Sequence, residues 1–132
     1  MSFTAVLVDT SVWIEAFRRK DAGVVSLLTD LLGQQRAVTV GQVMAEVLYG
    51  CRHDKEREKV KEAFEALPFI DTTRSDWIQA GDLGASLRRR GTTVPLSDLV
   101  IAAVALREGF PVFSLDKHFD VIPNLPIFPT SK

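Results

Sequence analysis

The sequence predicts an α/β domain, in which a central parallel sheet is covered by helices on both faces. Short apolar runs alternate with longer segments of helical periodicity, the order expected of parallel strands joined by helices. One segment, residues 99–106, is apolar all round, which indicates a helix buried in the core. The 132 residues, 46% hydrophobic and 25% charged, fit one compact domain that spans residues 1–132.

The first half of the chain opens with a predicted buried strand, residues 5–8, which is short, apolar and partly β-branched. Thr10 and Ser11 follow, and we expect them to cap the first helix because hydroxyl side chains accept hydrogen bonds from free backbone N–H groups. A second strand is expected at residues 37–40. The predicted helices of this half are residues 12–19, 23–33 and 42–49.

The second half of the chain opens with a charged amphipathic helix, residues 54–67, which Pro68 ends. A short strand is predicted at residues 69–70. The next helix, residues 75–90, is expected to place Trp77, Ala80, Gly84 and Leu87 along one side. The remaining predicted elements are the buried helix at 99–106, a strand at 111–114 and an edge strand at 127–128.

Composition also limits the compartment and the partners. The single cysteine, Cys51, forms no intrachain disulfide, so a reducing, cytoplasmic compartment is expected. The first nine residues lack the basic and apolar regions of a secretion signal. No apolar run approaches the roughly 20 residues that cross a bilayer, so we expect no membrane association. A net charge of −1 argues against global positive charge as a means of holding nucleic acid, although a local basic surface stays open.

Three acidic residues, Asp9, Asp98 and Asp116, stand at the places where parallel α/β folds form their sites, beyond the carboxyl ends of strands, and Glu46 is a fourth candidate. Asp9 closes the first strand, and Asp116 follows the strand at 111–114. Asp98 begins the buried helix, and Glu46 lies in the short helix after the second strand. Each acid taken alone has an ordinary explanation as a turn, cap or surface residue, but the set of four favours a shared site.

Carboxylates that converge need a counter-charge. Two unit charges about 4 Å apart repel by on the order of 4 kcal/mol at an effective dielectric of 20. Either some of the acids stay protonated or a cation neutralises them. An all-oxygen set without paired cysteines or clustered histidines suits a hard cation, Mg²⁺ or Mn²⁺. Such an ion lowers the pKa of a bound water and offsets charge on a phosphate, as phosphodiester hydrolysis requires.

The four acids lie in segments that resemble the PIN domain, and specifically the VapC-type toxins of toxin–antitoxin pairs. The segments are residues 8–14 (VDTSVWI), 43–50 (VMAEVLYG), 96–103 (LSDLVIAA) and 113–119 (FSLDKHF). They occur in the family's order and span almost the whole chain. The resemblance implies a three-layer α/β/α fold, a Mg²⁺- or Mn²⁺-dependent endoribonuclease, a homodimer and a cognate VapB-type antitoxin.

The resemblance also implies site residues. Its metal-binding and catalytic acids are Asp9, Glu46, Asp98 and Asp116. Ser114 stands where the family often has a threonine, and it is expected to orient Asp116 or a water. Asp120 is the second choice for the role of Asp116. Thr10 is interpreted as a helix cap. His118 is interpreted as a surface residue, with an approach to the substrate as the alternative because it follows Asp116.

Other functions and contacts remain open from the sequence. An α/β phosphatase or phosphoacceptor would use Asp9 as the attacked group, although the Asp-x-Asp pair of one such class is missing. A noncatalytic binding module with the same fold is the other alternative. Basic residues at 18–20 and 88–90, together with Lys117, are candidate contacts for an RNA backbone, but a solvated helix end is the favoured explanation of the basic runs.

Overall fold

The computed structural model describes residues 4–130 and confirms the predicted α/β class. Its four-stranded sheet has the order β3-β2-β1-β4, and every neighbouring pair is parallel. The strands are β1 (Val6–Val8), β2 (Ala37–Val40), β3 (Phe69–Ile70) and β4 (Val112–Phe113). Each connection between parallel strands passes through helices, as parallel pairing requires.

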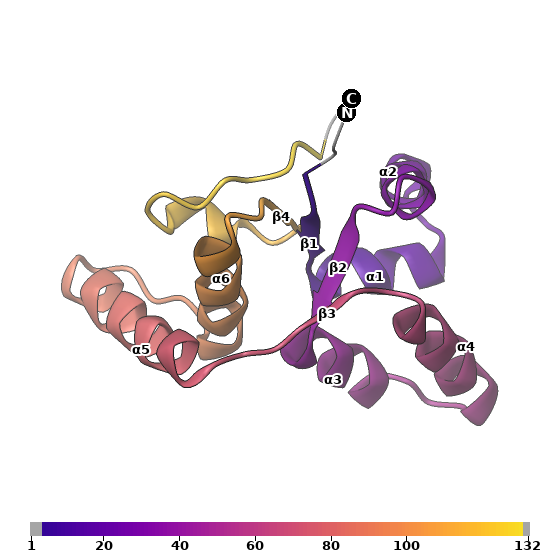
Figure 1. The fold of residues 1–132 in the computed structure, drawn as a ribbon, viewed down its shortest axis with the longest axis horizontal. Helices are drawn as coiled ribbons and strands as arrows, with labels where there is room; N and C mark the ends of the chain where they lie inside the picture. Colours follow the sequence, from indigo (N-terminus) through magenta and orange to yellow (C-terminus); the bar gives the residue numbers. More distant parts are fainter. Residues whose placement is uncertain (1–3, 131–132) are drawn as a thin grey trace.

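The helices cover the sheet on both sides. They are α1 (Thr10–Arg18), α2 (Ala22–Gly33), α3 (Gly41–Tyr49), α4 (Asp54–Glu65), α5 (Arg74–Arg89) and α6 (Leu96–Glu108), with a short 3₁₀ helix, η1 (Lys117–Val121). Figure 1 shows α5 and α6 on one side of the sheet and α1, α2 and α4 on the other. The three-layer α/β/α arrangement is therefore confirmed. None of the helices described is long and apolar enough to cross a membrane.

The centre of the core is formed by the strands and by α6. All residues of β1, β2 and β4 are buried, and α6 is buried continuously from Asp98 to Ala105. Burying one Val, Leu or Ile side chain contributes about 1.5–3 kcal/mol, so this helix is a main source of stability. Because α6 precedes β4, its N-terminus lies at the edge of the sheet where the parallel strands end.

The register of the sheet brings the ends of β1 and β4 together. Val8 pairs with Phe113, and the backbone N–H of Asp9 donates to the Phe113 carbonyl at 2.8 Å. Asp9 and Ser114, each the next residue along its strand, therefore lie side by side. This juxtaposition positions the candidate site described below.

Asp76 and Arg107 join the α5–α6 pair to the crossover from β3. The guanidinium of Arg107 donates to both carboxylate oxygens of Asp76 at 2.9–3.1 Å and to the Asp71 carbonyl at 2.9 Å. Asp76 is only 2% exposed and also forms a capping box with Thr73 at the start of α5. This network fixes the N-terminus of α5 against the C-terminus of α6.

Two local predictions were wrong, the cap of the first helix and the strand at 127–128. Asp9, rather than Thr10 or Ser11, is the N-cap of α1, because the acid's side chain accepts from the Ser11 N–H. On α5, Ala80 and Leu87 are buried, whereas Trp77 is 53% exposed. The expected strand at 127–128 is reduced to an isolated parallel bridge between Ile127 and Val112.

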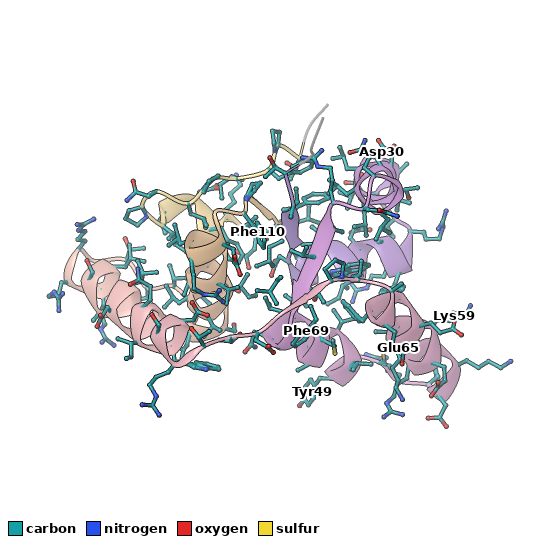
Figure 2. The ribbon with its side chains drawn as sticks, viewed as in Figure 1. Asp30, Tyr49, Lys59, Glu65, Phe69 and Phe110 are labelled. Atoms are coloured by element: carbon teal, nitrogen blue, oxygen red, sulfur yellow. The ribbon has the colours of Figure 1, made fainter. Side chains whose placement is uncertain are left out.

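Several exposed aromatic side chains lie on the outer surface. Figure 2 shows Phe69 over the β3 edge of the sheet and Tyr49 projecting outward from the end of α3. Their exposed fractions are 48% and 91%. Tyr49 is one helical turn from Glu46, so the two residues share a face of α3.

Candidate active site

Asp9 is a buried carboxylate held by hydroxyl groups. Its Oδ2 atom accepts from the hydroxyls of Ser114 at 2.7 Å and Ser11 at 2.8 Å, and its residue is 4% exposed. Hydrogen bonds to the charged form offset the cost of burying this carboxylate. Within residues 4–130 no hydrogen bond reaches the other oxygen, Oδ1. Asp9 therefore has one oxygen fixed by the protein and one available to a ligand.

Asp98 lies in the first turn of α6, as the sequence predicts, and is 9% exposed. Burial raises the pKa of its carboxyl group, and the charges of Asp9 and Asp116 raise this pKa further. The hydrogen bond with His118 acts in the opposite direction. Of the four predicted acids, Asp98 and Asp116 belong to one compact group of ligand atoms. Asp9 lies outside that group and is linked to Asp116 through the Ser114 hydroxyl.

Asp116 and His118 complete the cluster from the loop after β4. The Nδ1 atom of His118 lies 2.8 Å from Asp98 Oδ2 and 2.9 Å from Asp116 Oδ1. Ligand atoms of Asp98, Asp116 and His118 all lie within 4.8 Å of one another. These contacts raise the pKa of the His118 imidazole, first through its hydrogen bond to Asp98. His118 is exposed, as the interpretation as a surface residue requires, and it also contacts two of the predicted acids.

Sequence reasoning did not predict the contact between His118 and Asp98 because the two residues are distant in the chain. Asp98 lies 20 residues earlier, so no short metal-ligand motif links the two residues. The available signal was its position two residues after Asp116. The backbone N–H of His118 donates to Asp116 Oδ1 at 3.0 Å, and this turn folds the imidazole back toward the acids.

Glu46 is placed next to this cluster through Thr10. The Thr10 hydroxyl donates to Glu46 Oε1 at 2.9 Å, and Thr10 directly follows Asp9. Thr10 therefore contacts a site acid and does not cap the helix. Glu46 is half-buried and lines a cavity of about 410 Å³ together with Thr10, Ile14, Ala45 and Tyr49.

Ser114 connects the two strand-end acids. Its hydroxyl donates to Asp9 and accepts from the backbone N–H of Asp116 at 2.9 Å. Ser114 and Asp116 also line a cavity of about 300 Å³ with Lys117, Asp120 and the tail residues around Phe128. Asp120 is exposed in this cavity and, unlike Asp116, is absent from the compact group with Asp98 and His118.

The donor set fits a hard divalent cation. Asp98 and Asp116 present carboxylate oxygens close together, and Asp9 presents its unbonded Oδ1. Mutual repulsion and burial, which raise the pKa of Asp98, show that the arrangement is costly without a positive charge. Mg²⁺ and Mn²⁺ both accept such oxygen ligands.

Comparison with known proteins assigns the fold family. The family model of the PIN domain matches residues 6–125. The chain belongs to the PIN domain family. The match includes all four acidic positions, so the resemblance identified from the sequence motifs is confirmed for the family. PIN-domain nucleases depend on divalent metal ions, in agreement with the oxygen-rich donor set.

Individual relatives of this PIN domain are ribonucleases and toxin complexes. It is 29% identical to ribonuclease VapC11 of Mycobacterium tuberculosis over 124 residues, covering 91% of this chain and 92% of the relative. It superposes with a TM-score of 0.80 on VapBC2 from Rickettsia felis, solved with a promoter DNA fragment. That match has 22% identity and covers 95% and 98% of the two chains.

A second solved structure with the same fold is VapC20 of M. tuberculosis, described as a toxin that cleaves the sarcin–ricin loop. The TM-score is 0.72 at 18% identity, with 95% of this chain and 100% of that chain covered. At such identities the structural matches establish the shared fold.

Proposed function

We propose that this PIN domain is a metal-dependent endoribonuclease and the toxin of a type II toxin–antitoxin pair. The observation that carries the proposal is the close pair of Asp98 and Asp116, with Asp9 joined to Asp116 through Ser114, at the strand ends of a PIN fold. The ribonuclease relatives, matched over nine-tenths of the chain, support the reaction and its substrate. The similarity of the fold to solved toxin–antitoxin complexes supports the biological setting.

The residues have distinct tasks in this proposal. Asp9, Asp98 and Asp116 hold the Mg²⁺ or Mn²⁺ ion, and Ser114 and Ser11 fix Asp9 for that purpose. The ion supplies Lewis acidity for the scissile phosphate and a bound water of lowered pKa. Glu46, oriented by Thr10, accepts the proton of the attacking water or orients that water.

RNA binding is assigned to the surface around the acids. Lys117 follows Asp116 directly and lines the adjoining cavity, so its ammonium is placed for a phosphate neighbouring the cleaved bond. The basic runs at 18–20 and 88–90 are exposed and are assigned only a supporting, sequence-independent contact. The favoured location for the RNA is therefore the acidic edge of the sheet.

The proposed partners are a VapB-type antitoxin and a second copy of the chain. Solved relatives include complexes of toxin with antitoxin from Rickettsia felis and Salmonella typhimurium. An antitoxin that covers the acids would block the RNA. The homodimer follows from the family resemblance and stays a prediction, to be checked by light scattering of the purified protein.

The test is RNA cleavage by the wild type and by Asp98→Asn. Both proteins are expressed in a sensitive host, new RNA ends are mapped, and the purified proteins are assayed with Mg²⁺, with Mn²⁺ and after chelation. We expect cleavage by the wild type to need a divalent ion, and Asp98→Asn to reduce it at least about 100-fold. Asp82→Asn, an exposed acid on α5, is the matched control and should retain full activity.

The alternatives give different results in the same experiment. Cleavage that persists in Asp9→Asn or in Asp98→Asn would overturn the assignment of the site. Covalent phosphate on Asp9 after incubation with a phosphodonor would favour the phosphatase or phosphoacceptor. Absence of any cleavage by folded, metal-loaded wild type across total RNA would favour the noncatalytic module.

A further inference from the structure

The Nδ1 atom of the His118 imidazole lies between two site carboxylates. It lies 2.8 Å from an oxygen of Asp98 and 2.9 Å from an oxygen of Asp116. A ring nitrogen carries at most one hydrogen, directed along a single line in the ring plane. That hydrogen points fully at one carboxylate or is shared less directly between two, so one nitrogen faces two negative groups with a single donor.

The same distances fit three atoms bound to one metal ion. Ligands about 2.1 Å from an octahedral ion, at right angles to each other, lie about 3 Å apart. The two contacts of Nδ1 are close to this value, and all three ligand atoms fall within 4.8 Å. A metal ion in solvent can also reach the imidazole ring, because the His118 side chain is 45% exposed.

We propose that His118 is a nitrogen ligand of the divalent ion and that it makes the centre selective for Mn²⁺ over Mg²⁺. This inference rests on the proposed function, because it concerns the ion held by the same acids. On binding, the ion takes the place of the Nδ1 proton, which leaves to solvent, and Nδ1 donates its lone pair to the ion. The Nε2 atom then carries the remaining ring hydrogen.

The selectivity follows from ligand chemistry. Mg²⁺ binds oxygen ligands and keeps several waters, whereas imidazole nitrogen suits first-row transition metals such as Mn²⁺ better than Mg²⁺. A centre built only from Asp9, Asp98 and Asp116 would offer either ion oxygen ligands alone. Adding His118 therefore strengthens the binding of Mn²⁺ and changes that of Mg²⁺ little.

The experiment loads the purified full chain with Mn²⁺ alone and records pulsed electron paramagnetic resonance. A nitrogen bound directly to the ion gives a characteristic ¹⁴N modulation, and ¹⁵N-histidine labelling changes its pattern. We expect this signal in the wild type and its loss in His118→Ala and His118→Gln. The chain has two histidines, and His53→Ala is the matched control that should keep the signal.

Calorimetric titration supplies the second measurement. We expect His118→Ala to weaken Mn²⁺ binding about tenfold or more and to weaken Mg²⁺ binding by a smaller factor. Circular dichroism checks that each variant is folded, and His118→Gln keeps a polar side chain of similar reach. A narrowed ratio of Mn²⁺ to Mg²⁺ affinity in both variants supports the proposal.

The outcomes separate this inference from the function on which it rests. Mn²⁺ bound by the acids with no ¹⁴N signal, or a signal that survives both His118 variants, overturns the inference and leaves the nuclease intact. Unchanged metal affinity with a raised KM for RNA assigns His118 to the substrate and also overturns it. A wild type that binds neither ion, or binding unaffected by Asp98→Asn, overturns both proposals.

Discussion

Ser114 donates a hydrogen bond of 2.7 Å from its hydroxyl to Oδ2 of Asp9, across the ends of β4 and β1. The same hydroxyl accepts the Asp116 N–H at 2.9 Å. One buried side chain therefore sets the separation of two site acids. Its position is fixed by the parallel register that pairs Val8 with Phe113.

Removing this hydroxyl should affect both stability and activity. In Ser114→Ala the buried Asp9 loses its shortest hydrogen bond and the Asp116 N–H loses its acceptor. We expect the free energy of unfolding to fall by about 1–3 kcal/mol and RNA cleavage to fall about tenfold or more. Urea unfolding and cleavage assays measure the two effects. Ser75→Ala, on the exposed start of α5, should change stability by less than about 0.5 kcal/mol.

Thr10 should matter for cleavage more than for folding. Thr10→Val keeps the shape of the side chain but removes the 2.9 Å hydrogen bond to Glu46. Because Glu46 loses its orientation, we expect a 10- to 100-fold lower kcat and nearly unchanged Mn²⁺ affinity. Thr29→Val, at an exposed position of α2, is the control. An unchanged kcat in Thr10→Val would contradict the role given to Glu46.

Because of the ion pair of Asp76 and Arg107, the free energy of unfolding should depend on pH in the acidic range. Burial acts to raise the pKa of Asp76, but hydrogen bonds from Arg107 and Thr73 outweigh it and hold this pKa below its ordinary value. The folded state therefore binds this proton less readily than the unfolded state. The stabilisation is present above the unfolded-state pKa of about 4 and is lost as pH falls through the lower folded-state pKa.

Asp76→Asn isolates this contribution. We expect the variant to be about 2–3 kcal/mol less stable than the wild type at neutral pH, and the difference to shrink below about pH 4. Urea unfolding at a series of pH values measures both. Glu108→Gln, which loses only the more exposed pair with Arg107, should cost less than about 1 kcal/mol. If the stability difference between the wild type and Asp76→Asn grew as the pH fell, the pKa of Asp76 would not be lowered by folding, and the prediction would be contradicted.

Tyr49 tests where the RNA lies. The ring is 91% exposed and lines the cavity that contains Glu46, so it is placed to stack on a base near the cleaved bond. We expect Tyr49→Ala to leave the unfolding free energy within about 0.5 kcal/mol of the wild type. Single-stranded RNA binding should weaken by about 1–3 kcal/mol. Trp77→Ala, which removes an exposed ring on α5, should bind RNA normally.

Much of the fold was predictable because local patterns and tertiary packing agree. The apolar runs became the buried strands β1, β2 and β4, and the uniformly apolar segment at 99–106 became the buried helix α6. Asp9 and Asp98 were placed correctly because strand ends and helix starts are marked in the sequence. These positions depend on neighbours in the chain, which a single sequence displays.

The missed features depend on pairs distant in the chain. Thr10 contacts Glu46 across 36 residues, Arg107 contacts Asp76 across 31, and His118 contacts Asp98 across 20. A hydroxyl at a helix start is usually a cap, so the local rule for Thr10 gave the wrong role once Asp9 had taken the cap position. Side-chain pairing of this kind follows from helix packing, which periodicity alone does not specify.

The small residues in the middle of α6 determine where inactivating mutations are expected in a genetic selection. Ala102, Ala103 and Ala105 are at most 1% exposed, on the helix that carries Asp98 at its start. A larger side chain there would strain the interior by about 1–3 kcal/mol and displace Asp98. Colonies that survive expression of this protein should therefore carry inactivating changes at these alanines as well as at the acids.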